Sequence, residues 1–170
     1  LRDLALFNTG ISTMLRTSDL LALKVSDVMD EFGEVRTEHE LKMKKTGNKV
    51  VIDLDDNARN SLKEWIDSEN KDRFEYIFTG LGNRTPKDSP ITPHQHRRLI
   101  KEWCQFAGIG TEDRSSHSIR KTRATITYQR ENGSLEELKQ ALGHTTLKST
   151  SRYLGVEKKE MLEVLRRNQV

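Results

Sequence analysis

The chain contains one cysteine, three prolines and few aromatic residues, and it has no long hydrophobic run. A single cysteine, Cys104, excludes an internal disulfide framework and any zinc site built from several cysteines. The sequence shows neither an apolar stretch long enough to span a bilayer nor the pattern of a signal peptide. We therefore expect neither a disulfide-stapled secreted domain nor a partner membrane.

The composition that is present suits one folded domain with a polar surface. A length of 170 residues favours a single domain with an ordinary hydrophobic core. Charged residues make up 32% of the chain and the net charge is only +3. The segment from Arg97 to Arg130 is nevertheless locally basic, which is typical of a polyanion-binding face. Its basic residues, opposed only by Glu102, Glu112 and Asp113, are Arg97, Arg98, Lys101, Arg114, Arg120, Lys121, Arg123 and Arg130.

The first third of the chain predicts helices followed by short strands. Apolar residues at helical spacing predict a helix over residues 1–15, with Gly10 as a helix end and a second helix capped by Thr17 or Ser18. Residues 25–54 predict short strands with a hairpin tip at 46–48. Residues 57–67 then predict a helix with Trp65 in the core.

A helix beginning at Thr92 and Pro93 is expected to run to Ala107. We expect His94 and His96 in its first turn to lie at the surface and Cys104 to be a buried thiol. The predicted inner stripe consists of Leu99, Ile100, Trp103 and Phe106.

The last third predicts a series of capped helices. Ser115 or Ser116 is expected to cap the first, and Ser134 with Glu137 forms a capping-box pattern for the next. Gly143 is suited to end that second helix. A short helix is then expected from residues 145–146 to Tyr153, and a charged helix over 157–167, with Met161, Leu162 and Leu165 on one side.

This last third also gathers the chain's most reactive side chains. His117 and Arg120 form an H-x-x-R unit, and Tyr153 lies nine residues after His144. A zinc site on the two histidines is a rival interpretation, but a third ligand and an H-E-x-x-H pattern are missing. A serine triad is another, but the sequence has no G-x-S-x-G elbow. The set suits gripping a phosphodiester and attacking it with a tyrosine hydroxyl. Arg16, between apolar flanks at a helix junction, is either a surface arginine or an anion clamp.

Taken together, four segments resemble the boxes of the tyrosine recombinases, the phage-integrase and Xer-type family. The resemblance covers nearly the whole chain. Departures are few: residues 11–15 separate Gly10 from Arg16, H-S-I-R replaces the more usual H-D/E-L-R, and Asp53 stands where proline is frequent. The four segments are T-G-I-S-T-M-L-R-T-S-D-L, K-T-G-N-K-V-V-I-D-L, H-S-I-R-K-T and L-G-H-T-T-L-K-S-T-S-R-Y.

The resemblance implies an α+β fold: a mostly helical catalytic domain over residues 1–170, with a small antiparallel sheet near the N-terminal third. A core-binding domain of a longer protein would then be missing upstream. The resemblance also implies roles for individual residues. Asp19 would support the site from behind, and Lys44 is an alternative to Lys45. The implied catalytic residues are Arg16, Lys45, His117, Arg120, His144 and Tyr153.

The implied function is site-specific recombination or integration of double-stranded DNA through a 3′-phosphotyrosine intermediate, without metal, ATP or another cofactor. The resemblance further implies a tetramer on DNA, joined through the C-terminal helix, with accessory DNA-bending proteins. The protein would be cytoplasmic, bacterial or phage-encoded, and nucleoid-associated. Two alternatives stay open: relaxation of DNA like a type IB topoisomerase, and a catalytically silent DNA-binding module.

Overall fold

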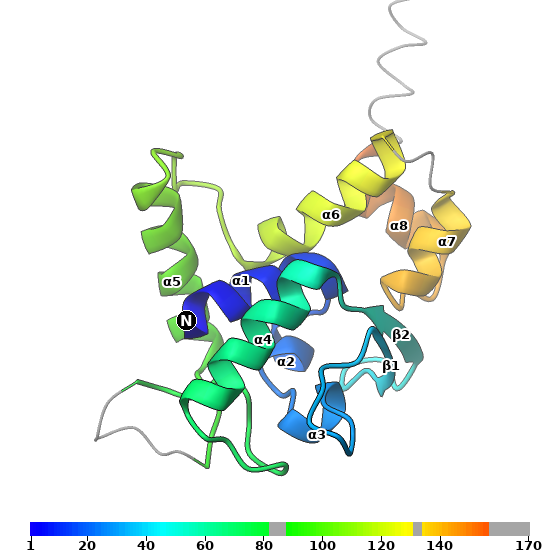
Figure 1. The fold of residues 1–170 in the computed structure, drawn as a ribbon. Helices are drawn as coiled ribbons and strands as arrows, with labels where there is room; N and C mark the ends of the chain where they lie inside the picture. Colours follow the sequence, from blue (N-terminus) through cyan, green and yellow to red (C-terminus); the bar gives the residue numbers. More distant parts are fainter. Residues whose placement is uncertain (82–87, 131–133, 157–170) are drawn as a thin grey trace, which may run out of the picture.

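The structure is a computed structural model that describes residues 1–81, 88–130 and 134–156 (Figure 1). None of the helices in these ranges combines the length and the apolar character that a bilayer crossing needs. In chain order the elements are α1 (Arg2–Thr13), α2 (Thr17–Leu20), α3 (Val25–Val28), β1 (Glu38–Lys42), β2 (Lys49–Asp53), α4 (Asp56–Ser68), α5 (Pro93–Phe106), α6 (Ser116–Arg130), α7 (Leu135–Ala141) and α8 (Leu147–Leu154).

The two strands form one antiparallel hairpin, as the sequence predicts. Glu38 pairs with Asp53 and Lys42 with Lys49. Burial alternates along β2, so Val50 and Ile52 enter the core while their neighbours face outward. The start of the region expected to be strands is different, because Val25–Val28 is a short helix.

A large hydrophobic core joins α1, α4 and the inner face of the hairpin. Trp65 lies in it as predicted, and its Nε1 donates to the carbonyl oxygen of Ile77 at 2.8 Å. The prediction that Gly10 ends a helix is wrong, since α1 continues to Thr13. A Cβ at Gly10 would lie 3.2 Å from Cγ2 of Ile119 on α6. The glycine therefore permits close packing of α1 against α6.

Helix α5 begins as predicted, with the Thr92 hydroxyl accepting from the Gln95 amide at 3.2 Å. Two side-chain predictions on it are wrong. His96 is 1% exposed rather than at the surface, because it lies on the same face as Leu99 and Ile100. Phe106 is 97% exposed, because it is the last residue of α5 and extends beyond the packed part of the helix. Cys104 is half-buried rather than fully buried.

The helices α6, α7 and α8 pack together beside the hairpin and form a second, smaller core (Figure 1). Its buried hydrophobic residues are Ala124, Leu138 and Leu142, against which Tyr128 and Tyr153 pack. The predicted capping box is present, because Ser134 and Glu137 exchange hydrogen bonds. The charged helix expected over 157–167 lies outside the described residues.

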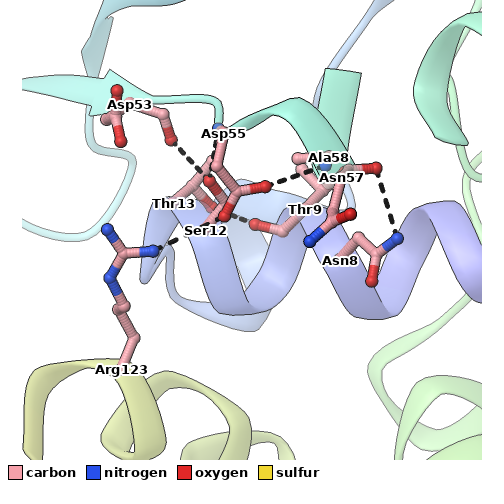
Figure 2. A network of polar contacts seen from close by, with 9 residues as sticks. All are labelled: Asn8, Thr9, Ser12, Thr13, Asp53, Asp55, Asn57, Ala58 and Arg123. Atoms are coloured by element: carbon pink, nitrogen blue, oxygen red, sulfur yellow. Dashed lines mark hydrogen bonds and ion pairs between the residues drawn. The ribbon is translucent and has the colours of Figure 1, made fainter. Parts of the chain in front are cut away.

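A polar network joins α1 to the start of α4 and to α6 (Figure 2). The Ser12 hydroxyl donates to the Asp53 carbonyl and accepts from the Asp55 amide, at 3.0 and 2.9 Å. One Asp55 carboxylate oxygen caps α4 at the Ala58 amide, and the other lies 3.5 Å from Nη1 of Arg123 on α6. The end of α1 is thus tied to the segment that precedes α4, and this segment is tied in turn to α6.

Candidate active site

The site is built around the turn that ends α7. The Gly143 amide donates to the Gln140 carbonyl and the His144 amide to the Lys139 carbonyl, both at 2.9 Å, the paired bonds of a Schellman motif. Gly143 has a φ of +59°, and a Cβ there would approach Cγ1 of Val50 on β2 to 2.9 Å. Both backbone angle and space therefore require glycine, which brings the turn against the hairpin.

Arg16 and Arg120 converge on this turn from different parts of the chain. Nη2 of Arg120 on α6 donates to the Leu142 carbonyl at 2.6 Å. Nη1 of Arg16, the residue before α2, lies 4.0 Å from the position of a Cβ at Gly143. The two arginines therefore lie on the same side of the molecule, within one peptide of each other along the turn.

Both guanidinium groups carry unused donors. Nη1 of Arg16 and Nη1 of Arg120 are buried without a hydrogen-bond partner in the described part of the chain. Burial, and secondly the charge of Arg16, lower the pKa of Arg120 to about 10, so it stays charged at neutral pH. Buried donors are normally satisfied, so two such nitrogens of like charge point to an anion as the intended ligand.

Tyr153 lies beside this pair. Its ring is 5.9 Å from Cζ of Arg120 and makes an edge contact with His144, with ring centroids 5.5 Å apart. Its hydroxyl donates to the backbone carbonyl of His117 at 3.4 Å. Burial raises the pKa of Tyr153 above its usual value, and the charges of Arg120 and Arg16 only partly counter this. The half-buried phenol is thus protonated and needs a base to become a nucleophile.

His144 follows the α7 turn and contacts α8. Its Nδ1 lies 3.0 Å from Oγ1 of Thr150, a fully buried residue. Burial, and then the charges of Arg120 and Arg16, lower the pKa of His144 to about 4. The imidazole is therefore neutral at neutral pH and carries one ring proton.

Asp19 lies one helical turn after Arg16 and faces the hairpin. Its Oδ1 accepts from the Lys44 amide at 2.8 Å, while Oδ2 is buried without a partner among the described residues. Its charge also raises the pKa of Arg120, so it lies close to the arginine pair. Asp19 thereby connects the arginine-bearing segment to the turn between the strands.

The side chains of two predicted catalytic residues, Lys45 and His117, lie outside this cluster. Lys45 lies in the exposed β1–β2 turn and makes no hydrogen bond or ion pair within the described ranges. The side chain of His117 is also exposed, and only its carbonyl contacts Tyr153. The structure thus gathers Arg16, Asp19, Arg120, His144 and Tyr153, and leaves Lys45 and His117 at the rim.

Sequence reasoning missed Thr150 and the Leu142 carbonyl. The signal for Thr150 is its position three residues before Tyr153, on the same face of α8. Across residues 1–81, 88–130 and 134–156, no three His, Cys, Asp or Glu side chains are grouped as a metal site would need. An apolar groove of about 750 Å³ between α1, α5 and α6 contains none of the clustered residues.

The family model described as the phage integrase family matches residues 1–160, and the chain belongs to that family. Its fold is the one found in solved structures of tyrosine recombinases. A crystal structure of the XerH site-specific recombinase bound to difH substrate, a pre-cleavage complex, superposes with a TM-score of 0.70 at 26% identity. The match covers 89% of this chain and 42% of XerH.

Two relatives in sequence carry names of the same kind. Probable integrase/recombinase YoeC of Bacillus subtilis is 34% identical over 158 residues, covering 92% of this chain and 78% of YoeC. Tyrosine recombinase XerC of Corynebacterium glutamicum is 26% identical over 165 residues, covering 96% of this chain and 49% of XerC. The chain thus spans about half the length of this XerC. The predicted α+β fold, mostly helical with a small antiparallel sheet, is confirmed.

Proposed function

We propose that residues 1–170 are the catalytic domain of a site-specific recombinase or integrase that cleaves and rejoins double-stranded DNA. The observation that carries this proposal is the pair of guanidinium nitrogens, on Arg16 and Arg120, that have no partner among the described residues, with the Tyr153 ring beside Arg120. In this proposal the pair holds the two non-bridging oxygens of a phosphodiester. The Tyr153 phenol, whose ring lies 5.9 Å from Cζ of Arg120, attacks the phosphorus. Family membership supports the same assignment.

In the proposed reaction, Arg16 and Arg120 hold the non-bridging oxygens and stabilise the charge of the transition state. His144 donates a further hydrogen bond to the phosphate. The Tyr153 oxygen forms a bond to phosphorus as the bond to the 5′ oxygen breaks. The phenol proton passes to His117, and the departing 5′ oxygen takes a proton from Lys45. Asp19 holds the hairpin turn that carries this lysine.

The raised pKa of Tyr153 supports the need for a base. His117 is the base that we assign, because its own backbone carbonyl accepts from the Tyr153 hydroxyl. In this proposal the exposed side chain of His117 turns toward the phenol to take the proton. The bound phosphate would bring Lys45 and His117 into the cluster from the rim.

The product of the first step is a 3′-phosphotyrosine link and a free 5′-hydroxyl. The link conserves the energy of the phosphodiester, so a 5′-hydroxyl from another strand can reverse the step without ATP. We further propose a tetramer on DNA, joined through the segment after Gly155 and assisted by DNA-bending proteins. Such an enzyme would act in the bacterial cytoplasm.

The test is a duplex site with a nick next to the cleavage position, so that the released short strand diffuses away. The wild-type protein should accumulate as a covalent protein–DNA adduct, with or without a metal chelator. Tyr153→Phe should form none. Tyr76→Phe, the same change at a tyrosine that packs under Lys24 and away from the site, is the matched control. An adduct with Tyr153→Phe, or none with the wild type, would refute the proposal.

Binding and relaxation assays separate the remaining alternatives. DNA affinity should fall with salt, log K changing by about 0.9 per neutralised phosphate against log salt. A silent binding module would show this salt dependence without an adduct. A topoisomerase would relax a supercoiled circle but would exchange no strands between two sites.

A further inference from the structure

We propose that Thr150 is a positioning residue that donates its hydroxyl proton to Nδ1 of His144 and so fixes the imidazole as the Nε2–H tautomer. Its consequence for DNA cleavage rests on the proposed function, whereas the tautomer itself does not. The starting observation is the 3.0 Å contact between Nδ1 of His144 and Oγ1 of Thr150. Either atom can donate in such a contact, so the direction must come from the surroundings.

Two helical threonines elsewhere in the described residues use their hydroxyls differently. The hydroxyls of Thr13 and Thr122 donate to the carbonyls of Thr9 and Ser118, four residues earlier, at 2.7 and 2.8 Å. Thr150 makes no such bond within the described residues, and its hydroxyl contacts only the His144 ring. Since Thr150 is 0% exposed, water cannot take its proton. A buried hydroxyl donates wherever it can, so its proton goes to the ring.

The ring is neutral, because burial and the two arginines lower the pKa of His144 to about 4. It therefore has one N–H, and accepting at Nδ1 places that N–H at Nε2. Nε2 has no partner among the described residues, and the charges of Arg16 and Arg120 act on the ring. An Nε2–H can donate to an anionic oxygen held by the arginines, whereas an Nε2 lone pair would repel it.

The same contact fixes the nucleophile. Thr150 and Tyr153 lie three residues apart on one face of α8, and the His144 ring packs by its edge on the Tyr153 ring. An imidazole ring held by Thr150 therefore also restricts the position of the Tyr153 ring. Such a ring acts as a hydrogen-bond donor to the phosphate and leaves deprotonation of Tyr153 to another group.

The direct test is nitrogen-15 NMR of histidine-labelled protein without DNA, with the His144 signals identified by their absence in His144→Gln. Wild type and Thr150→Ser, which keeps the hydroxyl, should show a protonated Nε2 and an unprotonated Nδ1. Thr150→Val, which removes the donor but keeps the shape, should lose this preference. Thr122→Val removes a hydroxyl that donates elsewhere and should leave the His144 signals unchanged. A wild-type ring protonated at Nδ1 would overturn the proposal even if Thr150→Val does not fold.

Cleavage of the nicked duplex gives the second readout. Thr150→Val should slow adduct formation by about tenfold or more, as loss of a group that orients a functional imidazole commonly does, and Thr150→Ser should restore most of the rate. In a His144→Gln background, Thr150→Val should cause no further loss, because its effect runs through the ring. An equal loss in both backgrounds would overturn the proposal. If the wild type forms no adduct but shows the expected tautomer, the proposed function fails and the positioning role stands.

Discussion

The two hydrophobic cores of the molecule contribute unequal shares of the site. Arg16 follows α1 and lies next to buried residues of the larger core, whereas Arg120, His144 and Tyr153 belong to the helices around the smaller one. Local stability follows buried apolar contact, so the smaller core should open more readily. The comparison teaches that Arg16, one half of the proposed anion clamp, should be held firmly. Arg120 and the proposed nucleophile Tyr153 lie on the part that we expect to be less stable.

The largest effect should come from removing either arginine. Arg16→Ala and Arg120→Ala should each slow adduct formation by about 10³-fold or more, because a positioned arginine contributes roughly 10³–10⁵ in phosphoryl transfer. Single-turnover cleavage of the nicked duplex measures this. Arg59→Ala, on α4 with an ion pair to Asp56, is the control outside the site. If only one of the two arginines matters, the clamp is not shared between the cores.

Removing one buried leucine from each core should separate global from local stability. Leu62 and Leu138 are 0% and 2% exposed. Leu62→Ala should lower the global free energy of unfolding by about 3 kcal/mol. Leu138→Ala should mainly speed amide hydrogen exchange in α7 and α8 and slow cleavage. Hydrogen exchange read by mass spectrometry distinguishes the two, and a uniform loss of protection in Leu138→Ala would show that the cores unfold as one.

The stability of the part of the molecule around the larger core should depend on pH through His96. Burial lowers the pKa of His96 from 6.5 to about 4. As the pH falls from about 6.5 to about 4, the unfolded chain takes up a proton that the folded state resists. Stability is therefore full above this window and falls within it, by roughly 3 kcal/mol for this residue. Denaturant unfolding of His96→Leu should be less pH-dependent than that of the wild type. If the free energy of unfolding of His96→Leu depended on pH as steeply as that of the wild type, His96 would not be buried in solution.

The smallest effect concerns the ion pair that joins the regions. Arg123 on α6 lies 3.5 Å from Asp55, and both side chains are about one-third exposed. Such pairs contribute at most about 1 kcal/mol. Arg123→Ala should thus lower stability by less than that, and Asp55→Asn should retain the α4 cap. A coupling well above 1 kcal/mol in a double-mutant cycle would make this pair a principal link between the cores.

Sequence reasoning succeeded where structure is local. The Ser134–Glu137 capping box and the termination of α7 by the turn at Gly143 depend on a few neighbouring residues, and both were predictable. The resemblance to the recombinase family added the residues that the fold brings together. Their roles stay predictions, because the structure places the residues without testing their chemistry.

Sequence reasoning failed where the answer depends on distant partners. His96 is spaced from Leu99, Ile100 and Trp103 as residues of one buried helix face are. The prediction placed it at the surface because histidine is polar. Phe106 continues that face but ends its helix. No local pattern reveals that Gly10 packs against α6 or that Asp19 holds the Lys44 amide, since each contact joins segments far apart in the chain.

Nη1 of Arg16 and Nη1 of Arg120, which have no partner in the part of the chain that the structure describes, have a consequence for the protein away from DNA. The folded chain holds two like charges close enough for Arg16 to lower the pKa of Arg120, and unfolding separates them. A tetrahedral oxyanion such as sulfate, bound only by the folded chain, would raise the melting temperature, and the rise would continue with the logarithm of its concentration above the dissociation constant. Sulfate should therefore raise it more for the wild type than for Arg16→Ala, measured against chloride at equal ionic strength. The heat resistance of the free protein thus depends on the salt in which it is dissolved.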